Sequence, residues 1–159
     1  MMLCLVLATW GANAQHDHAS QGDDQVMFED DKLGAAYTHY LHVKDALVAS
    51  KPAEAKKGAS ELQKALKEVK GSAKAAQATT KLINASDLTR QREAFSVLSN
   101  EMATLVKGGK LSKGSLYLEY CPMANNNQGA YWLSNDKEIK NPYFGDKMLK
   151  CGSVKETIQ

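Results

Sequence analysis

The residues of this chain that could do chemistry are four sulfur-bearing side chains near its C-terminal end. Cys121 and Met123 belong to one block, CPM, and Met148 and Cys151 to another, MLKC. In an extended strand, side chains two residues apart point to the same side, so Cys121 and Met123 can converge. In a helical turn, side chains three residues apart share a face, so Met148 and Cys151 can converge as well. The sequence therefore predicts two pairs of sulfur atoms.

Sulfur donors of this kind select soft metal ions. Thiolates and thioethers favour Cu(I) or Ag(I) over Mg, Ca or Mn, whereas a zinc site more often includes additional Cys or His. We therefore interpret Cys121, Met123, Met148 and Cys151 as candidate metal ligands, with copper or silver as the cofactor, provided that both thiols are reduced. Spacing leaves a second interpretation equally open, in which Cys121 and Cys151 form a disulfide and the methionines fill the core. The two interpretations can coexist as redox states.

The four histidines are weaker metal candidates. His16 and His18 lie in a polar N-terminal stretch and could bind Cu(II) or Ni(II), although a solvated tail is the favoured interpretation. His39 and His42 are three residues apart in a predicted helix, so they could share a metal. Helical periodicity places His42 opposite the apolar side, which favours a solvated pair.

No catalytic arrangement accompanies the cysteines in the sequence. A cysteine nucleophile needs a base, and the histidines are far away along the chain. The sequence contains no nucleophile elbow, phosphate-binding loop or HExxH motif. We therefore expect a binding protein and not an enzyme.

Charge and composition narrow the class of protein. The net charge is +2 with both signs interspersed, which gives no basis for nucleic-acid binding. No apolar run approaches the roughly 18–20 residues that a membrane span requires. The apolar run from Met2 to Ala8, followed by Ala12-Asn13-Ala14, is typical of a signal peptide cleaved after Ala14. We therefore expect an exported, periplasmic protein that has lost Cys4.

The remaining chain has the pattern of one helical domain. We expect a signal peptide over residues 1–14, a disordered polar lead over 15–29 and a single domain over 30–159. Apolar side chains recur every three or four residues in four segments. This recurrence predicts helices at about 30–50, 52–70, 73–83 and 88–107. Helices joined by such short connections pack as an antiparallel bundle.

The pattern changes after Gly109. Residues 115–120 alternate like a strand, and 130–133 could form a second strand, with a turn cluster at 125–129 between them. Residues 146–151 have the pattern of one or two helical turns. The predicted fold class is therefore mostly α, an antiparallel helical bundle with a small C-terminal β-hairpin or irregular cap that carries CPM and MLKC.

The C-terminal stretch LYLEYCPMANNNQGAYWLS…EIKNPYFGDKMLKCG resembles the DUF3347 family, and so do the upstream segments YLHVKDALVASKPAEAKKGASELQKAL and DLTRQREAFSVLSNEM. The likeness covers about residues 33–154. Its members occur as free exported proteins and as C-terminal modules on CusB-type adaptor subunits of copper and silver efflux pumps. The resemblance therefore implies copper binding or handover, with the four sulfur residues as ligands. Tyr120 departs from the family pattern, because some members have His before the cysteine.

These observations predict a periplasmic Cu(I)- or Ag(I)-binding or handover protein linked to metal efflux or resistance. Its partners would be the metal ion and a periplasmic adaptor of a heavy-metal efflux pump. The alternative is a non-metal scaffold or interaction module stapled by a Cys121–Cys151 disulfide.

Overall fold

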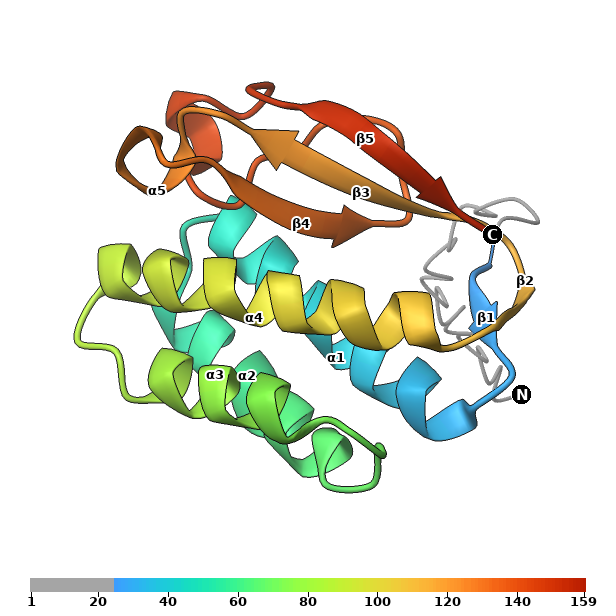
Figure 1. Ribbon diagram of the computed structural model, residues 1–159. Coiled ribbons are helices and arrows are strands. Elements are labelled where there is room, and N and C mark those ends of the chain that lie inside the picture. The colour runs from blue at the N-terminus through green and yellow to red at the C-terminus, as the bar shows by residue number, and fades with distance from the viewer. Residues whose placement is uncertain (1–24) are drawn as a thin grey trace, which may run out of the picture.

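The computed structural model describes residues 25–159, and within them the chain is mainly helical with small antiparallel sheets (Figure 1). The expected signal peptide and most of the polar lead lie outside the described residues. No helix in the described part is long and apolar enough to cross a membrane. The long helices, joined by short connections, are α1 (Asp31–Val48), α2 (Pro52–Leu66), α3 (Ala73–Ile83) and α4 (Leu88–Gly108).

The ends of these helices follow local sequence signals. Asp30 and Asp87 precede α1 and α4, and each carboxylate accepts a hydrogen bond from a backbone N–H of the first turn at 2.9 Å. Pro52 begins α2, where its missing N–H is not needed. The prediction of these four helices is confirmed. Helix α2 ends four residues before the predicted boundary, where the Ser72 hydroxyl donates to the Leu66 carbonyl at 2.5 Å.

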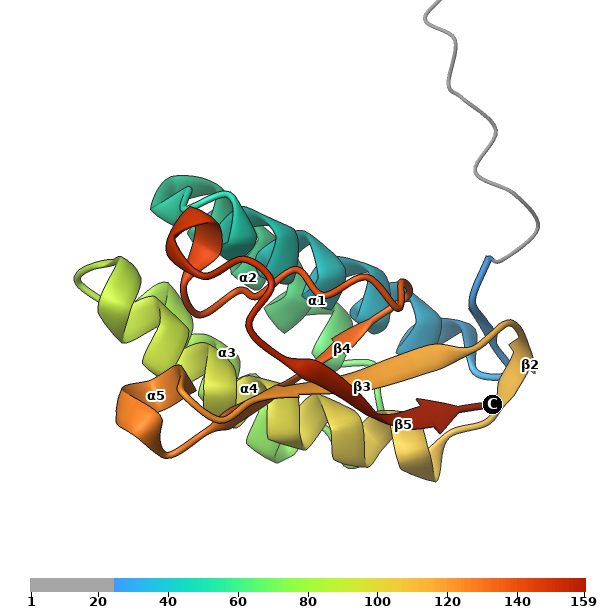
Figure 2. The same ribbon diagram turned by 90° about the horizontal axis from the view of Figure 1, so that it is seen from above.

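The helices form two layers beneath a sheet. Helices α1 and α4 lie next to the sheet, and α2 and α3 lie on their far side (Figures 1 and 2). Gly58 lets α2 approach α1 closely, because a Cβ there would lie 3.2 Å from Val43 Cγ2 and 3.3 Å from Val43 N. The largest fully buried apolar side chains of the helices are Tyr40, Leu47, Leu62, Leu66, Leu82, Phe95, Leu98 and Met102.

The C-terminal part forms a three-stranded antiparallel sheet in the order β4-β3-β5. The central strand β3 (Leu116–Cys121) pairs with β4 (Ala130–Ser134) on one side and with β5 (Ser153–Ile158) on the other. Strand β5 was not predicted, because almost all of its residues are exposed and it has no apolar alternation. It is ordered by pairing with β3, which is a tertiary effect.

The expectation that the polar lead is disordered as far as residue 29 is wrong at its end. Met27–Phe28 form strand β1, which pairs with β2 (Leu111–Lys113) in a two-stranded sheet. Phe28 is buried, and its ring centroid lies 5.4 Å from that of Tyr37. The Phe28 ring and the backbone pairing with β2 together hold this segment beside α1.

The turn cluster between β3 and β4 is present and has an uncommon conformation. It includes the short element α5 (Ala124–Asn127), in which Asn125, Asn126 and Asn127 have φ values of 51°, 57° and 63°. Asparagine tolerates the left-handed region better than most residues, because its short amide can bond locally. The three asparagines thus allow the chain to reverse immediately after the CPM block.

The predicted helical turns at residues 146–151 are correct only at their start. Only a single 3₁₀ turn, η1 (Gly145–Lys147), is present. The backbone N–H of Asn141 donates to the Leu149 carbonyl at 2.8 Å, which draws the chain back on itself. Residues after η1 therefore follow a compact loop into β5.

Candidate functional site

Cys121 and Cys151 form a disulfide whose Cα atoms lie 5.8 Å apart. The two residues are 30 positions apart in the sequence. Cys121 is fully buried at the end of β3, and Cys151 is half-buried just before β5. The sequence left a disulfide and a metal site open, and the structure contains the oxidised pair. The two sulfur-bearing blocks therefore do meet at their cysteines.

The methionines are not placed as the sequence reasoning predicted. Strand β3 ends at Cys121, so Met123 lies in a turn, with φ −85° and ψ −12°, and is 47% exposed. Met148 has φ −150°, so it does not share a helical face with Cys151. A hydrogen bond from Cys151 N to Met148 O at 3.1 Å keeps these two residues in one turn. A shared site with four sulfur ligands remains a prediction.

Residues 141–152, here called the Cys151 arm, are anchored to the helices and to the sheet. Arg92 on α4 donates from Nε to the Pro142 carbonyl at 2.8 Å. The Tyr143 hydroxyl donates to the Tyr131 carbonyl at 2.5 Å. The Tyr143 ring also lies between two core aromatic rings, with centroid distances of 5.8 Å to Phe95 and 6.0 Å to Trp132. The start of the arm is therefore fixed independently of the disulfide.

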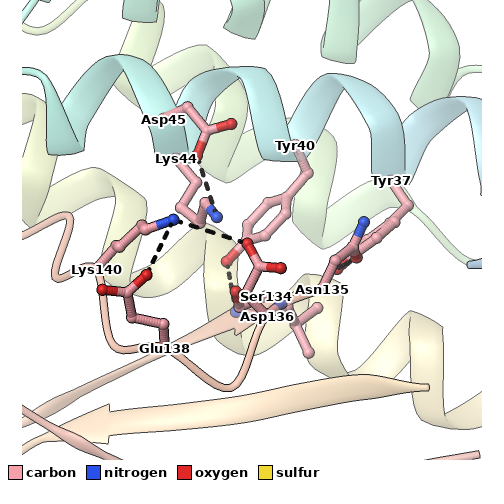
Figure 3. Close-up of polar contacts among 10 residues, drawn as sticks. Tyr37, Tyr40, Lys44, Asp45, Ser134, Asn135, Asp136, Glu138 and Lys140 are labelled. Carbon is pink, nitrogen blue, oxygen red and sulfur yellow. Dashed lines mark hydrogen bonds and ion pairs between the residues drawn. The ribbon is translucent and has the colours of Figure 1, made fainter. Parts of the chain in front are cut away.

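A polar cluster lies between α1 and the loop that follows β4 (Figure 3). Lys44 is buried, and its Nζ lies 3.1 Å from Asp45 Oδ1. On the loop, Lys140 Nζ lies 3.9 Å from an oxygen of Asp136 and 3.5 Å from one of Glu138. A hollow of about 920 Å³ separates the two sides. Both lysines are already paired with carboxylates, so the cluster offers no free cation for an anionic ligand.

Glu119 is the buried acid of this region, and sequence reasoning did not single it out. It is fully buried on β3, and neither carboxylate oxygen has a hydrogen-bond partner. The indole N–H of Trp132 faces it without hydrogen-bond geometry. Burial raises the pKa of Glu119 to about 7, against the attraction of the Lys44 ammonium. One feature of the sequence could have drawn attention to Glu119. It is two residues from Cys121, so the two side chains lie on the same face of the strand.

Tyr40 joins the helices to the sheet at the outer edge of β4. Its hydroxyl lies 2.8 Å from Ser99 Oγ on α4 and accepts a hydrogen bond from Leu133 N at 3.0 Å. Burial raises the pKa of Tyr40 above its ordinary value, so the phenol stays neutral. One hydroxyl thus holds an edge strand that supports the cysteine site.

His39 and His42, which lie in the described residues, form no assembled metal site. His39 and His42 line a groove between α1 and α2, with ring centroids 5.7 Å apart. Glu61 lines the same groove, but its carboxylate is 3.0 Å from Lys64 Nζ. Within residues 25–159, no three side chains of His, Cys, Asp or Glu are grouped so that they could hold a metal. His16 and His18 lie outside the described residues.

The helical layers, the antiparallel sheet and the disulfide define a small protein of mixed helical and β structure with one paired cysteine site. Residues 36–114 match the model of the family described as "Protein of unknown function (DUF3347)", and the chain belongs to this family. The matched range runs from α1 to the residue after β2, so both cysteines lie outside it. No curated protein and no solved structure matches the chain.

Proposed function

We propose that the reduced protein binds a soft monovalent metal ion, Cu(I) or Ag(I), through Cys121 and Cys151. The observation that carries this proposal is the 5.8 Å separation of their Cα atoms, which the fold imposes on residues far apart in sequence. Opening the disulfide leaves two thiols side by side, and their thiolates are ligands that soft metals prefer. Met123 and Met148, in the adjoining turns, would supply thioether donors.

The protein would act as a periplasmic carrier in metal efflux or resistance, with an adaptor of a heavy-metal efflux pump as its partner. This role rests on the family resemblance and on the expected signal peptide. The exposed Met123 supports transfer, because a ligand from a partner can approach a donor at the surface. In this proposal the antiparallel helical bundle is a rigid base, and the β-hairpin with the Cys151 arm is the metal-binding cap.

The disulfide itself favours a second candidate function, a non-metal scaffold or interaction module. A disulfide that closes a loop of this length stabilises a protein by roughly 3–4 kcal/mol in the chain-entropy model. Here it joins an arm with little regular secondary structure to the central strand. In an oxidising compartment such a bond would persist.

An anaerobic Cu(I) titration against a competing chelator tests the proposal. The samples are the reduced protein, the oxidised protein, a Cys121→Ser/Cys151→Ser variant and a Met123→Leu/Met148→Leu variant. We expect one equivalent of Cu(I) bound by the reduced protein and none by the oxidised protein or the serine variant. The leucine variant should bind more weakly, because it keeps the thiolates and loses the thioethers. His39→Ala/His42→Ala is the matched control and should bind as the wild type does.

The same titration distinguishes the two functions. Absence of Cu(I) binding by the reduced protein, or binding retained without the cysteines, would refute the metal proposal. If the protein isolated from cells is fully disulfide-bonded and binds no metal after reduction, the scaffold function is supported.

A further inference from the structure

Asn141, the first residue of the Cys151 arm, forms hydrogen bonds with three other residues of the arm. It is fully buried, and its Nδ2 donates to the Cys151 carbonyl at 2.8 Å. Its backbone N–H donates to the Leu149 carbonyl at 2.8 Å, and its Oδ1 accepts from Tyr143 N at 2.8 Å. One residue therefore ties together the start of the arm, its middle and the cysteine at its end.

Gly152 holds the other side of Cys151 against the sheet. Its φ is 145°, and a Cβ at this position would lie 2.8 Å from the Trp132 ring and 3.1 Å from the Tyr120 carbonyl. The backbone therefore lies directly on the sheet where no side chain fits. Asn141 and Gly152 therefore hold the backbone on both sides of Cys151, and neither contact involves the Cys151 sulfur.

The first residues of the Cys151 arm are also held in place without the disulfide. Residues next to Asn141 are held by Arg92 from α4 and by the Tyr143 hydroxyl bond to β4. When the disulfide opens, Asn141 thus stays attached to the core, and its hydrogen bond to Cys151 can persist. A buried amide that lost this partner would leave a donor unsatisfied, which favours keeping the bond.

We propose that Asn141 is the positioning residue of the thiol site and keeps Cys151 beside Cys121 in the reduced protein. The role of Asn141 extends the proposed function. It rests on that function only in assuming that the protein acts with Cys121 and Cys151 reduced. The consequence is a high effective concentration of the two thiols. Because ordering of the arm precedes binding, neither metal capture nor re-formation of the disulfide has to overcome its disorder.

The reduced state is reached by thiol–disulfide exchange with a dithiol reductant. A thiolate of the reductant attacks the sulfur of Cys151, the less buried of the two cysteines. The S–S bond breaks and its electron pair leaves on Cys121. The second thiolate of the reductant then attacks the mixed disulfide, which releases Cys151 and leaves the reductant oxidised. The two protons lost by the reductant pass through solvent to the two cysteines.

The role of Asn141 can be tested without metal by measuring the effective concentration of one thiol at the other, that is, how readily Cys121 and Cys151 form their disulfide. It is measured in the full chain, in a Cys4→Ser background, from the equilibrium with reduced and oxidised glutathione. Asn141→Ala removes two side-chain hydrogen bonds, of which only the one from Nδ2 reaches Cys151. We expect the variant to lower the effective concentration about tenfold, the scale of that one buried bond. Gln91→Ala is the matched control, because Gln91 is equally buried and its Nε2 bonds the Pro52 carbonyl at 3.0 Å, between two helices. It should lower thermal stability and leave the effective concentration unchanged.

Equal effective concentrations in wild type and Asn141→Ala, or an equal fall in Gln91→Ala, would overturn the proposal. If Asn141→Ala does not fold when reduced, Asn141→Asp is measured instead, since it keeps the oxygen acceptor and loses the donor to Cys151. A fall with Asn141→Asp supports the role, and an unchanged value overturns it. A Cu(I) titration of the same samples is scored separately. A wild type with a high effective concentration and no Cu(I) binding would refute the proposed function and leave the role of Asn141 standing.

Discussion

Glu119 lies directly opposite Trp132 across the β3–β4 ladder, and both side chains are fully buried with polar atoms that lack hydrogen-bond partners. The cation that attracts this carboxylate most strongly is Lys44 on α1, which is buried too and is paired with Asp45. An ionised carboxylate without hydrogen bonds is costly in such a place. The relationship therefore links the stability of the sheet that carries Cys121 to the protonation of Glu119.

Stability should fall between about pH 4.5 and pH 7 because of Glu119. The pKa of this carboxyl is about 7 in the folded protein against an ordinary value of 4.5. Over that interval the folded state binds the proton and the unfolded state does not, so rising pH favours unfolding. The full effect is roughly 3 kcal/mol of unfolding free energy, and the loss is complete above pH 7. Urea denaturation at a series of pH values measures it.

Glu119→Gln is the matched variant for that experiment. Its side chain is neutral at every pH, so the difference in unfolding free energy between wild type and variant isolates the Glu119 contribution. Wild type should lose stability relative to the variant as the pH rises from 4.5 to 7. A constant difference across this range would show that Glu119 has an ordinary pKa.

Tyr40→Phe should destabilise the protein more than Ser99→Ala does. Removing the phenol leaves Leu133 N buried without its acceptor, and an unsatisfied buried donor costs about 1–3 kcal/mol. Ser99→Ala removes the other partner of the hydroxyl, but Leu133 N keeps its bond. Thermal or urea unfolding of the two variants compares them. An equal loss of unfolding free energy in the two variants would show that the hydrogen bond from Leu133 N to Tyr40 does not contribute more than the bond to Ser99.

Two glycine substitutions should have opposite effects. Gly58→Ala places a Cβ 3.3 Å from the backbone N of Val43. Because this backbone atom belongs to a packed helix and cannot move away, we expect the unfolding free energy to fall by roughly 1 kcal/mol. Gly108→Ala meets no atom within 4 Å at the end of α4, so the gain in helix propensity of about 0.5 kcal/mol should remain. Unfolding midpoints of the pair test this. A stabilised Gly58→Ala would show that α1 and α2 can separate freely.

Loss of the disulfide should lower stability by roughly 3–4 kcal/mol without unfolding the helices. The Cys121→Ser/Cys151→Ser variant is compared with the oxidised protein by circular dichroism and urea denaturation. Helices α1 to α4 supply most of the buried apolar side chains of the core, so the helical signal should persist under native conditions. Loss of most of that signal would mean that the helices depend on the covalent closure of the sheet.

The sequence by itself determined the four long helices. Their apolar periodicity and the signals at Asp30, Pro52 and Asp87 act within a few residues, so they can be read without knowing the rest of the fold. The central strand was also predictable from its local pattern. Strands β1, β2 and β5 were not, because they are short or exposed and are ordered only by pairing.

The tertiary structure decided what surrounds the cysteines. Spacing could not distinguish a disulfide from a metal site, since a separation of 30 residues says nothing about distance in space. The environment of Glu119 depends on a helix and a loop that come from opposite ends of the chain. Asn141 reads in the sequence as a residue before proline, and only the folded chain gives it hydrogen bonds to Leu149, Cys151 and Tyr143. Long-range contacts made these choices, because local preferences fix the conformation of a segment and not the partners that it meets.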